Sequence, residues 1–311
     1  KELYEGKRIL IRRGILQKTA PKGQIIARLE MDTFSFRHSI ICIKLKEENE
    51  QLYEIITATL WSSVFRYYMF MTASTWGTWR QEIHLNEVLQ FPIAIPDARL
   101  AAKIVDVFNN LKAENKSLKN NSGGFLKMVP SQTIYKLERE LDNLIFELYK
   151  LTEFEKNLIR ERCSYDIDIY YNGYNSYALQ EINKTEDLKA YIEYFRKIWS
   201  KNIEHDEAFQ PNIILPQGSS MLAIVFKLIP KDVENSYNVF ADKEFSSLLA
   251  RIEDASKNEL HKKVFIQGIT RSTSDDEIVI IKRNQKRLWS KIEAKADADA
   301  TLLSAISKST K

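Results

Sequence analysis

The first hundred residues alternate between short apolar runs and polar turns, a pattern typical of a mixed α/β domain. The apolar run at 7–14 predicts a strand, and a Pro-Lys-Gly turn makes 24–29 its hairpin partner. The β-branched run 39–45 predicts a further strand in the centre of the sheet. Apolar residues on nearly every face of 53–71 predict one largely buried helix, and the prolines of 91–96 predict an extended segment.

From 97 to 163 the apolar period changes to that of helices. Apolar residues three and four positions apart predict two helices, carried by Ala101, Ile104, Val105, Phe108 and Leu111 and by Ile134, Leu137, Leu141, Leu144, Ile145 and Leu148. The polar stretch 120–124 separates them, and Thr152 with Glu155 forms a capping box that predicts a third, short helix. Two antiparallel helices joined by a polar loop would form a rigid spacer.

The last part of the chain predicts a linker and a small α+β domain. The polar, aromatic stretch 165–179 is interpreted as the linker. Helical and β-branched runs then alternate, with helices at 185–199, 243–260 and from 297, and strands at 220–229, 263–267 and 277–282. The predicted fold class is therefore α/β plus α+β: a mixed α/β domain at 1–96, a helical hairpin spacer at 97–163, a linker at 164–179 and a small α+β domain at 180–311.

The composition is that of an ordinary globular chain, with 44% hydrophobic and 28% charged residues in 311. Cys42 and Cys163 are too few for a disulfide framework or a zinc site, which fits a reducing cytosol. We interpret 55–71 as a buried helix rather than a membrane span, because Arg66 and several hydroxyl side chains interrupt it. The chain begins Lys-Glu-Leu-Tyr without a signal peptide, so we expect a cytoplasmic fragment of a longer protein, with no membrane contact.

Positive charge is concentrated at the amino end, although the net charge of the chain is only +4. Residues 1–28 hold two carboxylates against eight basic side chains: Lys1, Lys7, Arg8, Arg12, Arg13, Lys18, Lys22 and Arg28. Because such side chains contact phosphates and guanine edges, we expect six of them to bind DNA: Lys7, Arg8, Arg12, Arg13, Lys18 and Lys22. Arg12 and Arg13 point to opposite faces of a strand, so only one of them would reach a given groove. The alternative is an edge strand protected by its charge.

Two further segments combine aromatic and basic residues. The loop 72–80 makes Trp76 and Arg80 candidates for contact with DNA; the alternative is that the tryptophan rings pack beneath the preceding helix. The run 282–289 is a second basic cluster, with Lys282, Arg283, Lys286 and Arg287. We expect it to touch backbone phosphates or an acidic protein surface, and a solvated turn is the alternative.

Residues 60–93 contain three motifs in order: LWSSVFRYYMF at 60–70, STWG at 74–77 and LQFPI at 89–93. This combination resembles the region that follows the catalytic domain in N6-adenine-specific DNA methyltransferases of bacterial restriction–modification systems, where it belongs to the target recognition domain. Further segments are similar to the strands before that region, to the helical spacer after it and to the end of some large members: 7–14, 38–43, 141–152, 281–289 and 297–299.

The resemblance implies that 1–96 read a short site in double-stranded DNA and present an adenine for flipping into a pocket elsewhere. The spacer follows at 97–163, and 180–311 would pack on the parent enzyme or clamp DNA. The implied partners are duplex DNA and the catalytic methyltransferase domain of the same parent protein, which would hold S-adenosylmethionine. Two alternatives stay open. One is a stand-alone DNA-specificity subunit, although such subunits usually carry two recognition units and this chain shows no repeat. The other is a protein-interaction scaffold without affinity for nucleic acid.

No catalytic motif is present in the chain itself, so we expect no cofactor, metal or catalytic residue here. The nine glycines never form the Gly-x-Gly of a cofactor loop, and neither an Asn-Pro-Pro-aromatic tetrapeptide nor a phosphate-binding GxxxxGK[ST] loop occurs. Asp97, Glu114 and Lys116 loosely match a nuclease motif. That chemistry needs carboxylates on adjacent strands, whereas Asp97 is expected to cap a helix and Glu114 to lie near its end.

Overall fold

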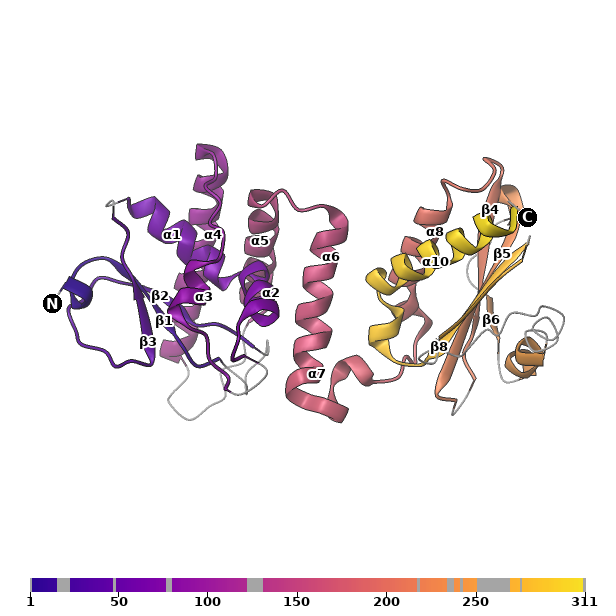
Figure 1. Cartoon of the computed structure of the whole chain (residues 1–311). Helices are drawn as coiled ribbons and strands as arrows, with labels where there is room; N and C mark the ends of the chain where they lie inside the picture. Colours follow the sequence, from indigo (N-terminus) through magenta and orange to yellow (C-terminus); the bar gives the residue numbers. More distant parts are fainter. Residues whose placement is uncertain are drawn as a thin grey trace. The chain divides into compact units, whose positions relative to one another are not determined.

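The computed structural model forms two compact units, Lys1–Gly173 and Tyr174–Lys311, which we describe separately (Figure 1). Both combine helices with a sheet, so the mixed α/β character predicted from the sequence is confirmed. The structure describes residues 2–15, 23–46, 49–76, 80–121, 131–216, 219–233, 238–240, 243–250, 269–274 and 276–309.

The first unit contains a three-stranded antiparallel sheet in the order β2-β1-β3. The strands are β1 (Arg8–Arg12), β2 (Ala27–Glu30) and β3 (Ile40–Ile43). The hairpin of β1 and β2 matches the prediction, with Ile9 opposite Leu29. The placement of the third strand was wrong: β1 is central and β3 pairs only with it among the described strands. β1 is therefore not an edge strand, and four of its five residues are buried.

Helices make up the rest of the first unit. They are α1 (Glu50–Trp61), α2 (Ser63–Thr72), α3 (Leu85–Leu89), α4 (Ala98–Asn121), α5 (Gln132–Leu148), α6 (Glu153–Glu161), a π-helical turn (Arg162–Asp166) and α7 (Ile167–Asn172). The capping box of Thr152 and Glu155 is confirmed at the start of α6. The predicted linker is helical as far as Asn172, because the chain continues from α6 through the π-helical turn into α7.

The single helix predicted at 53–71 is broken at Ser62 into α1 and α2. The Ser62 hydroxyl donates to the carbonyl of Thr59 at 2.7 Å and accepts from the amide of Phe65 at 3.4 Å. One serine thus ends the first helix and caps the second, a competition with the helical backbone that apolar periodicity cannot reveal. Asp97 likewise caps α4 by accepting from the amide of Leu100 at 2.8 Å, and Glu114 lies in the same helix, which leaves no nuclease geometry.

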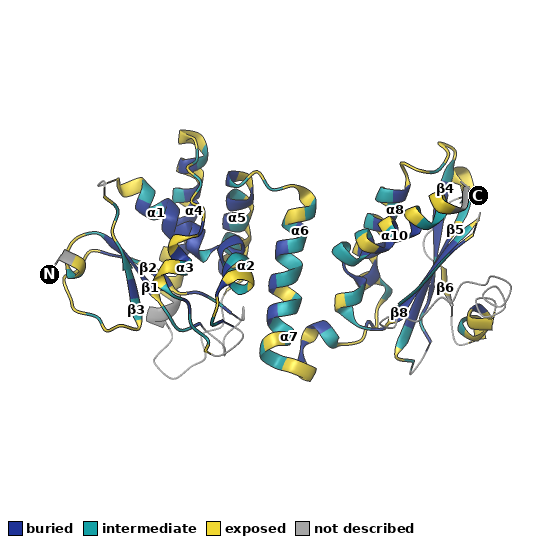
Figure 2. Cartoon of the chain, viewed as in Figure 1, coloured by how far each residue is buried: buried dark blue, intermediate teal, exposed yellow. Residues whose placement is uncertain are grey.

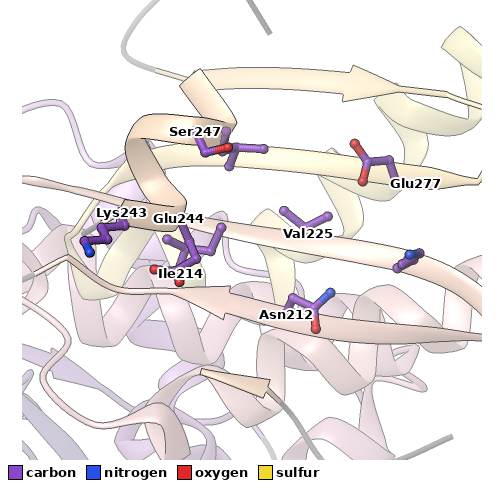
Figure 3. Close-up of a pocket in the computed structure, with 9 residues that line it drawn as sticks. Asn212, Ile214, Val225, Lys243, Glu244, Ser247 and Glu277 are labelled. Carbon is purple, nitrogen blue, oxygen red and sulfur yellow. The ribbon is translucent and has the colours of Figure 1, made fainter. Parts of the chain in front are cut away.

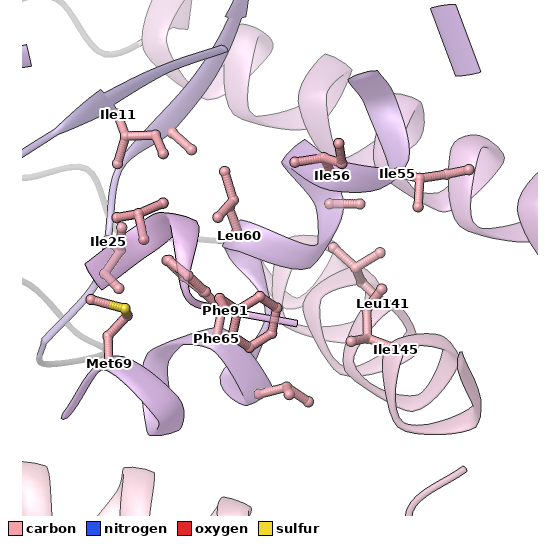
Figure 4. Packing of buried hydrophobic residues seen from close by; sticks show 14 of the residues in the cluster. Ile11, Ile25, Ile55, Ile56, Leu60, Phe65, Met69, Phe91, Leu141 and Ile145 are labelled. Atoms are coloured by element: carbon pink, nitrogen blue, oxygen red, sulfur yellow. The ribbon is translucent and has the colours of Figure 1, made fainter. Parts of the chain in front are cut away.

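One hydrophobic core runs through the whole first unit, from the sheet to α4 and α5 (Figure 4). Ile11 of the sheet, Phe65 of α2 and Ile145 of α5 are all fully buried within it. Each such side chain contributes about 1.5–3 kcal/mol. The predicted boundary at 96–97 is therefore not a structural boundary: the helical hairpin shares a core with the sheet (Figure 2).

The second unit is built on a five-stranded sheet in the order β6-β4-β5-β8-β7. The strands are β4 (Glu207–Ile214), β5 (Met221–Pro230), β6 (Asn238–Phe240), β7 (Ile269–Thr273) and β8 (Glu277–Arg283); only the β4–β6 pair is parallel. Helices α8 (Lys189–Trp199) and α10 (Lys291–Ser309) pack against one face, and residues 243–250 form a helix whose Leu248 packs against the other.

The sequence predicted part of this second unit. The helix ending at 199 and the strands of β5 and β8 are confirmed. The strands β4, β6 and β7 were missed, and α10 begins six residues earlier than expected. Pro211 in the middle of β4 and the polar sequence of β7 hide these two strands from a pattern search. The predicted strand 263–267 and the end of the helix at 243–260 lie outside the described residues.

Candidate nucleic-acid interface

Arg8 lies inside the first unit and is withdrawn from the predicted DNA-binding set. Its side chain is fully buried, at 0% exposure. The guanidinium donates to the carbonyl of Gly6 at 2.7 Å and to that of Asp32 at 2.6 Å, and it lies 5.1 Å from the ring centre of Phe34. A cation held by two backbone carbonyls and covered by an aromatic ring secures the loop after β2 and cannot reach a phosphate.

Lys7 is also engaged within the protein. Its ammonium contacts the Glu50 carboxylate at 2.6 Å, lies 5.8 Å from the ring centre of Tyr53 and is only 17% exposed. The hydrogen bond from Lys7, together with its charge, lowers the pKa of Glu50. Because Glu50 is the first residue of α1, this pair ties the start of the sheet to the start of the helix.

Trp76 is a packing residue, as the alternative interpretation held. It is 3% exposed, and its indole N–H donates to the hydroxyl of Tyr171 at 2.9 Å. The Tyr171 hydroxyl in turn donates to the side chain of Gln81 at 3.0 Å. Gly23, with a φ of +69°, passes so close that a β-carbon there would lie 2.9 Å from the indole ring. Trp76 therefore anchors its loop to α7 through Tyr171 and packs against Gly23, which precedes β2.

The chain after β1 brings two of the predicted DNA-binding segments together. The amide of Ile15 donates to the carbonyl of Gln81 at 2.8 Å, and the amide of Ile83 donates to the carbonyl of Arg13 at 3.0 Å. On the other side, the amide of Arg13 donates to the carbonyl of Ser39 at 2.9 Å. Residues 13–15 thus lie between 81–83 and the turn that precedes β3, although these segments are far apart in the sequence.

Four arginines gather at this end of the sheet, and we call them the arginine edge: Arg12, Arg13, Arg37 and Arg80. Three are exposed and Arg13 is half-buried. Arg12 is opposite Ile40 in the sheet, and Arg37 forms the turn into that strand. Glu82, which pairs with Gly14, is the one carboxylate on these paired segments. The edge therefore carries an excess of positive charge and guanidinium groups able to form paired hydrogen bonds with phosphate or guanine.

Sequence reasoning found three members of the arginine edge and missed Arg37. The signal was present, because in an antiparallel pair the beginning of one strand lies beside the end of its neighbour. The turn before β3 must therefore lie beside the end of β1. Lys18 and Lys22, which the sequence also predicted to bind DNA, lie outside the described residues.

In the second unit, Lys282 does not belong to a surface cluster. Its side chain is fully buried at 0% exposure; it donates to the carbonyl of Leu288 at 2.9 Å and forms an ion pair with buried Asp297. Arg271 also contacts Asp297, with its Nε 2.8 Å from Oδ1. Burial lowers the pKa of Lys282. Burial also raises the pKa of Tyr191 well above its usual value, and the nearby negative charge of Asp297 raises it further. This network holds the interior together.

The other members of the second basic cluster do lie at the surface. Arg283 and Arg287 are exposed, and the ammonium of Lys286 lies 3.9 Å from the ring centre of Tyr177. The backbone here is fixed: the amide of Lys286 donates to the carbonyl of Gln180, and Asn284 forms hydrogen bonds with both backbone groups of Ile182. Three cations are thus presented on a firmly held turn.

The second unit also has a hollow of about 540 Å³ on the open face of its sheet (Figure 3). Asn212, Val225 and Glu277 of three strands line it, and Ser247 of the helix 243–250 covers part of it. Residues 251–268, which follow that helix, lie outside the described part of the chain. The hollow is therefore not assigned any chemistry.

No family model, curated protein or solved structure matches this chain. Within the described residues, no three His, Cys, Asp or Glu side chains lie close enough together to hold a metal ion. None of the described helices combines the length and the apolar character needed to cross a membrane.

Proposed function

We propose that the first unit binds double-stranded DNA through the arginine edge. We further propose that the chain is the DNA-recognition part of a site-specific adenine-N6 DNA methyltransferase of a bacterial restriction–modification system. The methyl transfer and its S-adenosylmethionine cofactor would then belong to the catalytic domain of the same parent protein, in the cytoplasm. The finer part of this proposal is supported by the motifs at 60–93.

The gathering of four arginines from three distant segments carries the proposal of DNA binding. Exposed guanidinium groups on neighbouring segments repel one another, more strongly the closer they lie. A polyanion that lies across them removes this repulsion and releases its own counterions. Arg12 and Arg80 are exposed and so are free to reach a phosphate or a base edge.

The second unit offers a smaller surface for backbone contacts. Arg283, Lys286 and Arg287 would touch phosphates beyond the recognised site. This is the role of a clamp and carries no sequence information by itself.

A protein-docking role is the second candidate, and a specific observation favours it. Apolar side chains after α2 are exposed to solvent, most of all Leu89 and Ile95. Exposed apolar groups close together in the sequence are typical of surfaces that bind another protein. This surface is compatible with contact to a catalytic domain, and equally with a scaffold that never binds DNA.

Salt-dependent binding of the 311-residue chain to duplex DNA tests the proposal. If the three exposed arginines, Arg12, Arg37 and Arg80, each neutralise one phosphate, the slope of log affinity against log salt is about −2.7, so affinity falls roughly fortyfold between about 50 and 200 mM salt. The double substitution R12A/R80A should reduce that slope by about two. A random duplex pool should also yield one enriched short site.

The matched control is R99A/R139A, which removes two exposed arginines from α4 and α5 and so changes the net charge equally. Its slope should equal that of the unchanged chain. A response that does not vary with salt, or an equal loss in the control, contradicts DNA binding through the arginine edge. Binding without enrichment of any site contradicts the recognition role.

A further inference from the structure

The first unit contains a second feature that DNA binding does not use: a cavity of about 310 Å³ where the hairpin, the α1–α2 break and the helical pair meet. Four apolar side chains line it: Leu60, Trp61, Leu111 and Leu141. Three ionisable groups line it as well, Arg66 of α2 and Glu138 and Asp142 of α5. A mostly apolar cavity with a few charged groups is typical of a small-ligand site.

Several hydrogen-bond donors around this cavity already have partners. The indole N–H of Trp61 donates to the carbonyl of Ala27 at 2.9 Å. The side-chain amide of Asn115 donates to the carbonyl of Leu111, also at 2.9 Å. The amide of Ser63 donates to Oδ1 of Asp142 at 2.6 Å. These donors are therefore not available to a ligand.

The carboxylates are less well satisfied. Within the described part of the chain, Glu138 forms neither a hydrogen bond nor an ion pair. It interacts with Arg66 and Asp142 only through longer-range electrostatics. Burial raises the pKa of Glu138 and also that of Asp142. The Ser63 hydroxyl is more than nine-tenths buried and lies beside Asp142, yet it makes no hydrogen bond of ordinary geometry among the described residues.

Glu138 and Asp142 thus line the cavity together with one guanidinium, that of Arg66. The charge of Arg160 also acts on Asp142, so Glu138 is the carboxylate that lacks a close partner among the described residues. Half-buried charge without a partner is unfavourable, so a positive group that enters the cavity would be stabilised. We propose that this cavity binds a small organic cation: an ammonium, amidinium or guanidinium group carried on an apolar body. The cation would donate to Glu138 and Asp142, while its body packs against Trp61 and Leu141.

Other ligand classes fit less well. An anion would meet two carboxylates. A hard metal ion prefers six or more oxygen ligands, whereas this cavity offers two carboxylates, a guanidinium and an apolar wall. The volume is also large for an ion and sufficient for a ring with a charged head.

Three ligands of the same shape but different charge test the proposal by calorimetry on the 311-residue chain: benzamidine, benzamide and benzoate. Benzamidine should bind, and benzamide and benzoate should bind at least about tenfold more weakly. The substitution E138Q keeps the shape of the side chain and removes its charge. It should lower the affinity for benzamidine by roughly tenfold to a hundredfold, because charge-assisted hydrogen bonds are the strong ones.

The matched control is E140Q, an exposed carboxylate on the same helix that does not line the cavity. It should bind benzamidine as the unchanged chain does. Equal binding of benzamidine and benzamide, no binding of benzamidine at all, or equal losses in E138Q and E140Q would each overturn the proposal. The unfolding curves of E138Q and E140Q should coincide with that of the unchanged chain. If E138Q does not fold, D142N replaces it, because the Oδ1 of the new side chain still accepts the hydrogen bond from the amide of Ser63. None of these measurements involves DNA, so they stand apart from the proposed function.

Discussion

The substitution Asp297→Asn is expected to destabilise the second unit strongly, because it leaves a buried ammonium without its counterion. Asp297 and Lys282 are both fully buried and form an ion pair. The only other carboxylate near Lys282 in the described part of the chain is Glu293, which lies 3.9 Å away and is partly exposed. In the variant, the oxygen of the new side-chain amide can still accept from Arg271 but carries no charge to offset that of Lys282.

The size of the effect follows from the kind of pair that is broken. Removal of one partner from a buried ion pair costs roughly 3–5 kcal/mol. Removal of the other partner, in Lys282→Met, should lower the free energy of unfolding by less. Asp297 then keeps the contacts with Arg271 and the hydrogen bond from the Tyr191 hydroxyl, and the main loss is the donor to the carbonyl of Leu288. We therefore expect a cost of about 1–3 kcal/mol, the value for one unsatisfied buried polar group.

The two variants should also differ in their dependence on pH. Burial already lowers the pKa of Lys282 in the folded chain, and the loss of Asp297 lowers it further. Between that folded pKa and the unfolded value near 10.4 the unfolded chain binds more protons, so stability rises with pH, by at most about 1.4 kcal/mol per pH unit. The stability lost in Asp297→Asn should therefore shrink as pH rises toward the unfolded value, whereas the stability lost in Lys282→Met, which has no ammonium to titrate, should not shrink over the same range.

Denaturant-dependent hydrogen exchange, read by mass spectrometry, measures these effects in the relevant unit. Peptides from β8 and α10 report on the cluster, and peptides from α4 and α5 in the first unit serve as an internal reference. A larger cost for Lys282→Met than for Asp297→Asn would refute the reasoning. So would a deficit of Asp297→Asn that does not change with pH.

Three more predictions concern the first unit. Gly23→Ala should lower the free energy of unfolding, measured by thermal unfolding, by about 2 kcal/mol or more, because the φ of +69° is left-handed and the new β-carbon would lie 2.9 Å from Trp76. Gly6→Ala should lower it less, because Gly6 has a similar φ of +70° but no atom nearer than 3.8 Å. Burial raises the pKa of Tyr171 to about 12, so its neutral form stabilises the fold below pH 10 and this contribution is lost as pH rises through 12. In an ultraviolet titration, Tyr171→Phe should remove one late-ionising phenol, whereas Tyr174→Phe, which changes an exposed residue, should remove none. Arg8→Met should lower stability by roughly 2–4 kcal/mol yet leave the salt slope of DNA affinity unchanged, and a smaller slope would return Arg8 to the interface.

The sequence predicted elements better than it predicted their boundaries and neighbours. Apolar periodicity correctly indicated the first hairpin, the helical pair and two strands of the second sheet. It did not indicate the break at Ser62 or the shared core across 96–97. Helix breaks depend on the hydroxyl of a single residue, and a shared core depends on contacts between residues far apart, such as Ile11 and Ile145. Neither leaves a periodic trace.

The errors at Arg8 and Lys282 have one physical origin, which is that charge in a sequence does not reveal burial. Arg8 and Lys282 each lie in a basic stretch, and each is among the largest fully buried side chains of the chain. Both occur on strands whose two faces are covered, so the alternation of apolar and polar positions that marks an exposed face is lost. A cation that adjoins an apolar strand, as in Arg8-Ile9-Leu10-Ile11 and Ile280-Ile281-Lys282, can therefore be an interior group that needs a partner.

Arg8 and Arg12 adjoin the same apolar run, yet only Arg12 remains in the proposed interface. The two side chains lie on the same face of β1, four residues apart. The loop after β2 covers that face at Arg8, through the carbonyl of Asp32 and the ring of Phe34, whereas Arg12 is exposed at the far end of the strand. One end of the strand therefore uses its arginine to hold the fold, and the other end leaves its arginine free to meet a partner. Which role each arginine takes depends on the loop beside it, and only the three-dimensional arrangement places that loop.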